Sequence, residues 1–521
     1  MRRIRATAAI AVCAFAIHAA PQGGAAGPTQ SAQPPAQWAA YIEAARKADG
    51  IADNEARCRA YPDLPGNHWL PGAAQARCSL LRKPAVSLDE MDRLLSTPDG
   101  PAELERRFAA LLKAHYEDQS QREQIFVSLF VFDDSDRSRQ ISQRWLELSP
   151  KSAFAHAAVA RHHDSSGWKA RGAKFIRDTP EASVQSMTHE FALAVPLYAK
   201  AMEIEPRLSF ACVRMAAIGR QSSDALQRYA MDRCTKVDPD SYYLALERET
   251  GSQPRWGGSD EELRMAIAYA AARVGRNPIL GALLGEHAGY GPSAAKNLGE
   301  VARELEAAAL MAPSGRLSAD TGRGYRVKGD PWAAVGYLSQ ATRFWPDDAE
   351  YRNERGGVLY DRLDDAAWAL RDMLKSVELA PEDSKYAYRT GQVTRAVSGE
   401  VAARPFFKRA MEDPKRRGAA MEMYCQTYVL AEATTSDAQQ CTLDLVTEYP
   451  ESAEGWRQRG WVLYLIGSPD AVAAIDRYVQ LADRNDPFHQ RGVEIALAQK
   501  AELEAWMGKS GKPAGAGPQA H

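Results

Sequence analysis

A recurring spacing of small, large and proline residues in the C-terminal part of this chain constrains its fold more than any other feature. The clearest occurrence starts near Gly315 and comprises Gly322, Tyr325, Gly329, Ala334, Leu338, Ala341 and Pro346. The small residues let two helices approach closely, and the large residues fill the seam between them. The proline ends the second helix. The spacing therefore predicts a pair of antiparallel helices.

These positions resemble the consensus of the tetratricopeptide repeat, in which successive helix hairpins stack on one another. Further copies of the pattern begin near Gly356, Gly391 and Trp456, and a degraded copy follows Cys425. The resemblance implies an all-α fold, a right-handed superhelix of antiparallel helix hairpins. Tetratricopeptide-like repeats are expected over residues 314–507.

Upstream, the pattern weakens over residues 39–313. Second helices that end in proline persist there, at Pro150, Pro206, Pro239 and Pro313. Their irregular spacing predicts degenerate hairpins with long loop insertions. The segment Gln124–Phe132 has the β-branched and aromatic content of a buried strand, but its place between helical segments favours a buried helix. A flexible linker is expected over residues 27–38 and a disordered tail over residues 508–521.

The N-terminus has the layout of a secretory signal peptide. Three arginines within the first five residues precede a 15-residue, mostly apolar stretch that ends at Ala20 and holds no acidic residue. This stretch is shorter than the roughly 20 residues that a membrane-spanning helix needs. We expect a signal peptide over residues 1–26, cleaved after Ala19 or Ala26. The mature protein is then periplasmic or secreted and has no transmembrane segment.

The six cysteines beyond the signal peptide fall into three pairs along the chain: Cys58 with Cys78, Cys212 with Cys234, and Cys425 with Cys441. The midpoints of these pairs, His68, Ser223 and Ala433, all lie in predicted turns, and residues equidistant from the turn of a helix hairpin face each other. An even number of cysteines in an oxidising compartment favours disulfides. We predict these three disulfides, each within one hairpin; the alternative is that the cysteines are small buried thiols.

Composition argues against nucleic acid as a partner. The formal net charge of the 521-residue chain is -2, and loss of the three signal-peptide arginines lowers it by three, to -5. Proteins that bind nucleic acid rely on positive charge against the phosphates. No phosphate-binding loop, Gly-x-Gly-x-x-Gly fingerprint or His-Glu-x-x-His motif occurs, so no cofactor or metal is expected.

Two tryptophan-containing motifs stand out between residues 106 and 276: Ser166–Gly172, which reads SGWKARG, and Pro254–Ser259, which reads PRWGGS. Residues 106–276 resemble an uncharacterised bacterial family, domain of unknown function 4034. The resemblance implies no activity, because none is established for that family.

The first of these motifs lies in a long interval, since 30 residues separate His163 from Ala194. The interval predicts an insertion in a hairpin, and long insertions are often functional. A site that recognises a carboxylate or a sugar has these candidates: Trp168, Arg171, Arg255 and Trp256. The alternative is that these side chains pack the loops onto the solenoid.

Histidines near the first motif are the best candidates for an enzyme. His156, His162, His163 and Asp164 are of residue types that bind zinc or transfer protons. The spacing of seven between His156 and His163 differs from the three or four that two ligands on one helix use. A hydrolase or metal-dependent enzyme that uses His156–Arg171 is therefore the alternative to a binding protein, and no catalytic residue is assigned.

Exposed positions on the first helix of each repeat line the groove of tetratricopeptide-like proteins. Here they comprise Arg316, Arg323, Arg326, Asn353, Tyr360, Tyr388, Gln392, Arg395, Arg457, Trp461 and Tyr464. Cationic and aromatic residues dominate this set. It suits a protein or peptide partner with acidic side chains or a free C-terminal carboxylate. The alternative is an ordinary solvated face, with Trp461 and Tyr464 packed against the next helix.

Overall fold

The structure is a computed structural model that describes residues 33–510, with side chains over residues 33–508. Within that range every regular element is a helix and there is no strand, which confirms the all-α class. The expected signal peptide, residues 1–26, lies outside the described residues. So do residues 27–32 of the expected linker and residues 511–521 of the expected tail.

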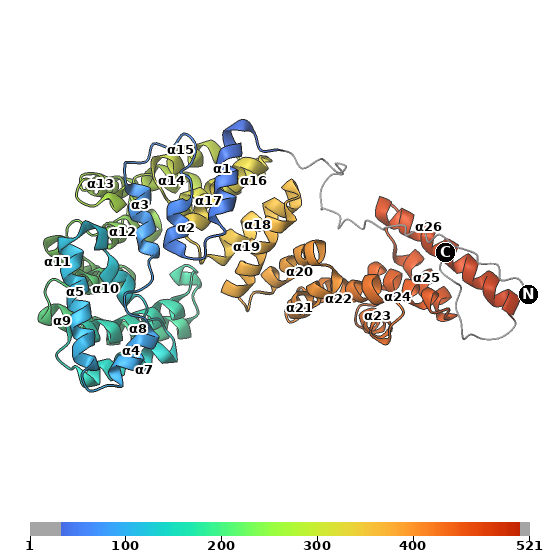
Figure 1. Cartoon of the computed structure of the whole chain (residues 1–521), viewed down its shortest axis with the longest axis horizontal. Coiled ribbons are helices and arrows are strands. Elements are labelled where there is room, and N and C mark those ends of the chain that lie inside the picture. The colour runs from blue at the N-terminus through green and yellow to red at the C-terminus, as the bar shows by residue number, and fades with distance from the viewer. Residues whose placement is uncertain (1–32, 511–521) are drawn as a thin grey trace, which may run out of the picture. The chain divides into compact units, whose positions relative to one another are not determined.

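The described chain divides into two compact units, residues 34–346 and residues 347–510. The division falls one hairpin after residue 313, where the repeats become regular in sequence. The α-helices of the first unit are α1 (Ala36–Ala48), α2 (Asn54–Ala60), α3 (Ala73–Cys78), α4 (Leu88–Leu95), α5 (Gly100–Glu117), α6 (Gln124–Leu129), α7 (Asp136–Leu148), α8 (Ala153–Arg171), α9 (Glu181–Ile204), α10 (Ser209–Ser222), α11 (Asp224–Val237), α12 (Tyr242–Gly251), α13 (Asp260–Ala271), α14 (Glu286–Ser293), α15 (Ala302–Met311), α16 (Gly315–Lys328) and α17 (Pro331–Phe344) (Figure 1).

Short 3-10 helices interrupt the loops of this unit: η1 (Ser79–Leu81), η2 (Gln119–Gln121), η3 (Ile176–Asp178), η4 (Pro254–Trp256) and η5 (Pro278–Leu283). The helices of the second unit are α18 (Ala349–Leu363), α19 (Ala366–Leu379), α20 (Ser384–Ser398), α21 (Glu400–Ala410), α22 (Arg417–Glu432), α23 (Ser436–Glu448), α24 (Ala453–Leu465), α25 (Asp470–Leu481) and α26 (Pro487–Ser510). None of the helices described is long and apolar enough to cross a bilayer.

The hairpin of α16 and α17 shows how the repeat pattern specifies structure. Ser314 and Asp330 cap the two helices through their side chains. Gly329 ends α16 in the left-handed region, at φ 86°, where a glycine is favoured. A Cβ at Gly322 would lie 2.7 Å from Cγ of Leu338, so a larger residue there would separate the helices. The expectation of stacked antiparallel hairpins is confirmed, since α18 with α19, α20 with α21 and α24 with α25 pack in the same way.

The upstream expectations are met in part. Helices α7, α9, α11 and α15 each end shortly before a proline, and Gln124–Phe132 forms a helix, α6, followed by a short turn. The prediction of a long insertion between His163 and Ala194 is wrong. Both α8 and α9 are long helices that pack on each other, and only residues 172–180 connect them. Helix α1 begins at Ala36 and α26 reaches Ser510, so the expected linker and tail are partly helical.

The N-terminal helices close the first unit by packing on its last hairpin. Helices α1 and α2 contact α17, and in Figure 1 they lie beside it. Trp38 packs edge-on against Tyr337, with ring centroids 5.7 Å apart. The Tyr41 hydroxyl donates to the carbonyl of Gly336 at 3.0 Å. Arg343, which is fully buried, donates through Nε to the carbonyl of Cys58 at 2.8 Å. These contacts join residues nearly 300 positions apart in the chain.

Three disulfides join the predicted pairs. Cys58 is bonded to Cys78, Cys212 to Cys234 and Cys425 to Cys441. The second and third pairs each join the two helices of one hairpin, α10 with α11 and α22 with α23. The first joins α2 to α3 across a loop. Cross-links of this kind stabilise a folded domain by about 2–4 kcal/mol, mainly by restricting the unfolded chain.

Candidate functional site

The predicted groove residues of the first unit are engaged by acidic side chains. Arg316 binds Glu286 through Nε, at 3.1 Å, and through Nη2. It also contacts Asp320 at 3.4 Å, and Arg323 pairs with the same carboxylate at 3.2 Å. Arg326 is exposed near the end of α16. Because Arg316 and Arg323 neutralise carboxylates of their own unit, they are poor candidates for holding a carboxylate of a partner.

A further acidic residue, Glu249 of α12, lies within electrostatic range of Glu286 and Arg316. Its Oε1 accepts a hydrogen bond from Gln253 Nε2 at 2.7 Å. Burial, and then the charge of Glu286, raises the pKa of Glu249 from its ordinary value of 4.5 to about 7. Between pH 4.5 and about 7, Glu249 is therefore protonated in the folded protein but ionised in the unfolded chain. Stability contributed by that proton is lost as the pH rises through the window.

This pKa predicts a pH dependence of folding. Between about pH 5.5 and 7.5, Glu249 alone is expected to lower the free energy of unfolding by about 2 kcal/mol. In Glu249→Gln, which cannot ionise, this part of the decrease is expected to vanish. Denaturant unfolding at both pH values measures it. Glu261→Gln, at a fully exposed position, is the control and keeps the wild-type dependence. Equal decreases in wild type and Glu249→Gln contradict the raised pKa.

In the second unit, four predicted groove residues gather on α18 and α20. Tyr360, Tyr388, Gln392 and Arg395 are all partly exposed, whereas Asn353 is buried, so its expected exposure is wrong. Burial raises the pKa of both tyrosines, and the charge of Arg395 opposes the rise in each case. Arg395 is thus within electrostatic range of both phenol groups. We call these four partly exposed residues the tyrosine–arginine face.

Arg395 differs from its neighbours because its hydrogen-bonded partner is neutral. Its Nη1 donates to Gln426 Oε1 on α22, whereas Arg389 pairs with Asp361 at 2.6 Å. Burial raises the pKa of Glu400, and the charge of Arg395 opposes that rise. Among the described side chains, no carboxylate oxygen lies within ion-pair distance of Arg395. A guanidinium group has five N–H donors, so Arg395 keeps donors for a ligand.

The predicted groove residues on α24 lie against the final helix. Tyr464 is buried, and its hydroxyl donates to Glu502 of α26 at 2.7 Å. Trp461 stacks on Tyr464, with ring centroids 5.8 Å apart. Arg457 lies 5.5 Å from the ring of Phe488, also on α26. The packing alternative therefore describes these residues, because their side chains contact α26 or one another.

The structure brings the two tryptophan motifs together at the ends of α8 and η4. The rings of Trp168 and Trp256 meet edge to face at 6.4 Å. Arg171 and Arg255 lie 6.0 and 5.5 Å from the Trp256 ring. Arg220 of α10, which the sequence did not single out, lies 4.2 Å from Trp256 and 5.4 Å from Trp168. No spacing rule marks Arg220, because it comes from a separate hairpin.

Two arginines of this cluster, Arg220 and Arg171, have hydrogen-bonded partners within the protein. Arg220 binds Glu247 of α12 through two hydrogen bonds, of 2.7 and 3.3 Å. Burial raises the pKa of Glu247, and Arg220 opposes that rise. Arg171 donates to Gln221 at 2.8 Å. These contacts tie the ends of α8, α10 and α12 together, as the packing alternative predicts. Recognition of a carboxylate or sugar here stays a prediction.

The candidate histidines lie on α8 and have separate partners. His156 Nδ1 bonds the carbonyl of Ser152 at 2.7 Å, and His162 Nδ1 bonds a loop carbonyl at 2.8 Å. His163 pairs with Glu190 at 2.8 Å. Asp164 is buried beneath arginine side chains, of which Arg214 binds it at 2.7 and 3.0 Å; Arg161 lies at 3.5 Å and Tyr198 donates to it at 3.1 Å. Across residues 33–508, no group of three or more potential ligands is placed to hold a metal.

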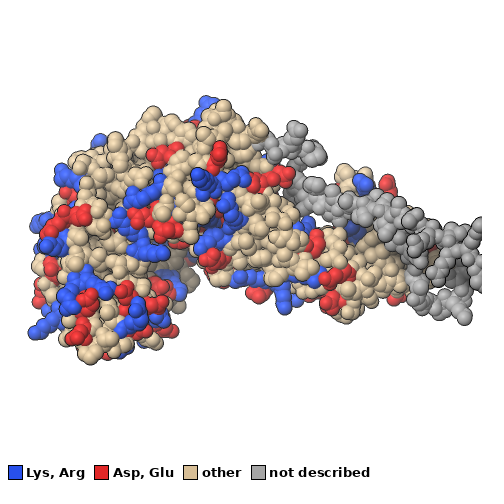
Figure 2. All heavy atoms as spheres, viewed as in Figure 1, with Lys and Arg blue, Asp and Glu red and all other residues tan. Residues whose placement is uncertain are grey.

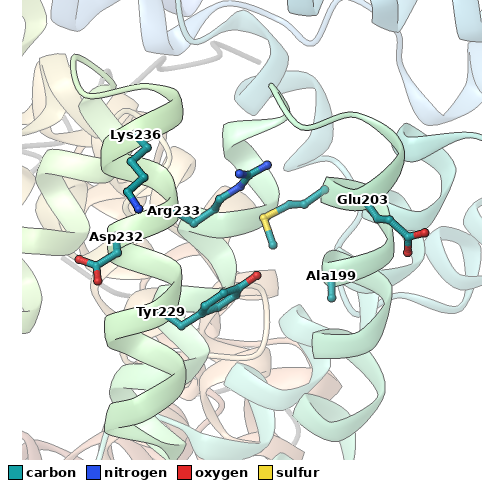
Figure 3. A pocket seen from close by; sticks show the side chains of 7 residues that line it. Ala199, Glu203, Tyr229, Asp232, Arg233 and Lys236 are labelled. Carbon is teal, nitrogen blue, oxygen red and sulfur yellow. The ribbon is translucent and has the colours of Figure 1, made fainter.

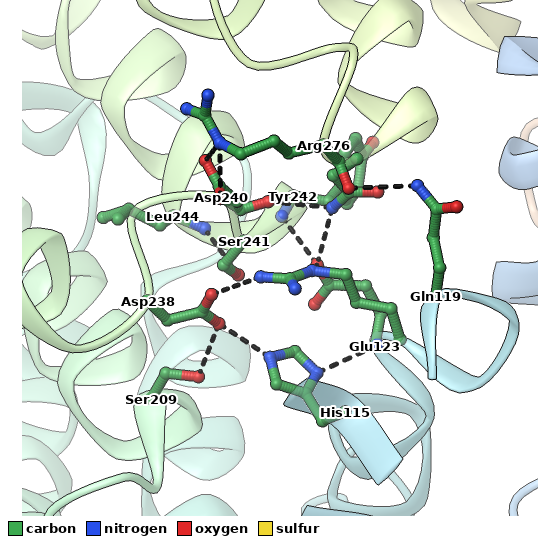
Figure 4. A network of polar contacts seen from close by, with 12 residues as sticks. His115, Gln119, Glu123, Ser209, Asp238, Asp240, Ser241, Tyr242, Leu244 and Arg276 are labelled. Carbon is green, nitrogen blue, oxygen red and sulfur yellow. Dashed lines mark hydrogen bonds and ion pairs between the residues drawn. The ribbon is translucent and has the colours of Figure 1, made fainter. Parts of the chain in front are cut away.

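A buried polar network joins α5, α10 and the loop after α11 (Figure 4). His115 Nδ1 accepts from the backbone N–H of Glu123 at 3.0 Å, so Nε2 carries the proton and donates to Asp238 at 2.7 Å. Ser209 donates to the same carboxylate at 3.1 Å, and Arg122 also binds it. The serine contacts the aspartate and not the histidine, unlike a Ser-His-Asp triad. Both ring nitrogens of His115 are occupied, so this network stabilises the fold.

The surface of the first unit carries a cavity and intermixed charges. A cavity of about 490 Å³ lies between α9 and α11, with Tyr229, Arg233 and Lys236 on one side and Met202 and Glu203 on the other (Figure 3). Apart from the buried Met202, its side chains are charged or exposed, and they include both signs. On the face drawn in Figure 2, basic and acidic side chains are intermixed. Neither feature forms a strongly charged site.

No family model matches this chain, and no curated protein matches it in sequence. Solved structures of repeat proteins are similar to it at low identity. YrrB, a tetratricopeptide-repeat protein with an unusual peptide-binding site, is 15% identical with a TM-score of 0.33, over 38% of this chain and 99% of YrrB. MamA of Desulfovibrio magneticus RS-1 is 16% identical with a TM-score of 0.27, over 38% and 97%. Cut9, from the Cut9–Hcn1 complex of APC/C, is 11% identical with a TM-score of 0.31, over 89% and 97%. The resemblance of residues 106–276 to domain of unknown function 4034 stays a prediction.

Proposed function

We propose that this chain is an exported helical-repeat module that binds a protein or peptide partner through the tyrosine–arginine face. The observation that carries the proposal is the state of Arg395. It is partly exposed and lies within electrostatic range of Tyr360 and Tyr388. Its hydrogen-bonded partner is the neutral side chain of Gln426.

The chemistry of this face favours an acidic ligand. A guanidinium group binds a carboxylate through two parallel hydrogen bonds, and such charge-assisted bonds are about twice as strong as neutral ones. Tyrosine rings add contact area at a low cost in side-chain entropy and are enriched at interfaces. Gln392 provides an amide for the backbone of an extended peptide. The partner is thus a segment with acidic side chains or a free C-terminal carboxylate.

Export to the periplasm or the cell exterior belongs to the same proposal. It rests on the signal-peptide layout of residues 1–26 and on the three paired cysteines. Disulfides persist in oxidising compartments and are rare in the cytosol. The enzymatic alternative on His156–Arg171 is not proposed, because the candidate histidines there bond to separate partners and not to a shared ligand.

Charge reversal on the face tests the proposal. Arg395→Glu is expected to reduce capture of the native partner from periplasmic extract at least tenfold, because it places like charge against an acidic ligand. Lys408→Glu, an equal charge change at an exposed position of α21, is expected to leave capture unchanged. Crosslinking with quantitative mass spectrometry measures both. A companion array of acidic peptides, with free or amidated C-termini, identifies the ligand group. Equal capture by wild type and Arg395→Glu contradicts the proposal.

A further inference from the structure

A polar cavity of about 240 Å³ lies where the N-terminal helices meet the body of the first unit. Its walls come from α2, α3 and η1 on one side and from the loops before α6 and η5 on the other. A buried water needs only about 15 Å³ of such space. The cavity therefore has room for a small polar molecule.

Three guanidinium groups line this cavity, and only one carboxyl group does. Arg59 and Arg82 share the carboxylate of Glu55, at 2.7 and 3.1 Å. Arg122 binds Asp238 of the buried network, and neither Glu55 nor Asp238 lines the cavity. Two arginines on one carboxylate leave positive charge uncompensated. The Nε of Arg122 is buried and makes no hydrogen bond among the described residues, although it lies 4.0 Å from Oε1 of Glu123.

The single carboxyl group on the wall, that of Glu123, is unusual in two respects. Its backbone has φ 69°, in the left-handed region, which costs a residue other than glycine about 1–3 kcal/mol. Its side chain is buried, with Oε1 accepting from the backbone N–H of Tyr242 at 2.7 Å and from Asn277 at 3.4 Å. The second oxygen, Oε2, has no partner within residues 33–508.

Oε1 of Glu123 accepts from the first N–H of α12, that of Tyr242, whereas this contact gives Oε2 no role. Burial raises the pKa of Glu123 above its ordinary value. Oε1 already accepts two N–H groups, so Oε2 is the carboxyl oxygen that is left without a donor. The wall otherwise presents the N–H donors of three guanidinium groups. A buried donor without an acceptor is costly, and an oxyanion in the cavity would supply acceptors.

We propose that this cavity binds a small oxyanion, a carboxylate or a phosphate, through Arg59, Arg82 and Arg122. The site is separate from the tyrosine–arginine face, which belongs to the other unit. Anion binding here bridges the N-terminal helices and the loops at residues 119–123 and 277–279. Occupancy of the cavity therefore stabilises the closure of the first unit.

Calorimetric titration of the full mature chain tests the site, with inorganic phosphate and succinate as separate probes at constant ionic strength. Each is compared with chloride. Saturable binding of one anion per chain is expected, and the tighter probe tells whether the site prefers phosphate or carboxylate. Arg59→Gln is expected to weaken binding about tenfold or more, as for loss of one charge-assisted contact. Arg228→Gln, an equal charge change on the exposed face of α11, leaves binding unchanged.

Glu123→Gln separates binding from folding. The amide keeps an oxygen for Tyr242, removes the carboxyl charge and places an N–H donor at the position of Oε2, so the variant is expected to bind an anion at least as tightly as wild type. Loss of binding in this folded variant overturns the proposal. So does the absence of saturable binding of either anion up to about 20 mM, and so does equal weakening by Arg59→Gln and Arg228→Gln.

Discussion

Asp238→Ala is expected to lower the free energy of unfolding of the first unit by about 4 kcal/mol, the range for breaking a buried ion pair from one side. The side chain of Asp238 is 1% exposed and binds His115, Arg122 and Ser209 (Figure 4). Alanine leaves Arg122 as a charge without its carboxylate and His115 with an unsatisfied N–H. Urea unfolding followed by circular dichroism measures the loss.

The neighbouring acid supplies a matched control. Asp240, whose side chain is 17% exposed, pairs with Arg276 at 2.8 Å and with Arg273 at 3.7 Å, and the side chain of Arg276 is 59% exposed. Exposed ion pairs contribute about 0–1 kcal/mol. Asp240→Ala is therefore expected to cost less than about 1 kcal/mol. Similar losses in the two variants would show that the Asp238 network is no more stabilising than an ion pair at the surface.

Arg343→Met is expected to cost about 3 kcal/mol and to release the N-terminal helices from α17. Arg343 is fully buried and donates to the carbonyls of Cys58 and Pro62, at 2.8 and 3.3 Å. Methionine fills much of the same volume but has no donor. The carbonyl of Pro62 keeps a second donor, Gln340 Nε2 at 2.6 Å, so only the carbonyl of Cys58 loses this donor, at a cost of about 1–3 kcal/mol. The ion pair of Arg343 with Asp63, at 2.7 Å, is lost as well. Hydrogen exchange measures the release as a loss of protection in α1 and α2.

Arg326→Met is the control for Arg343→Met, because Arg326 is exposed on α16 of the same unit. It is expected to change neither stability nor exchange. Protection that falls evenly over the whole unit in Arg343→Met, with no excess at α1 and α2, would argue that Arg343 does not hold the N-terminal helices in particular.

Local signals made much of the fold predictable. Gly322 and Leu338 meet across one hairpin, and prolines mark where second helices end. The disulfides followed from the positions of turns because each pair spans a single turn or loop. These features depend on residues within about 30 positions of each other, which spacing alone can relate.

Other features had no local signal. The contact of Arg343 with Cys58 joins positions 285 apart, and nothing in either segment marks it. The same holds for Arg220, which meets Trp168 and Trp256 from a third hairpin. Exposure within the groove was also mispredicted. Repeat position identifies the inner face, but whether Tyr464 is open depends on where α26 packs.

The closure of the first unit has a consequence for the order in which the chain acquires its structure. Helices α1 and α2 come first in the described chain, but their partner α17 follows almost 300 residues later. Contacts between such distant segments form slowly, since the intervening chain must first be ordered. The intermediate hairpins can stack as they are made. Helices α1 and α2 can pack on α17 only once the chain up to Phe344 is present. The first helices of the described chain are therefore expected to be among the last to gain protection from hydrogen exchange.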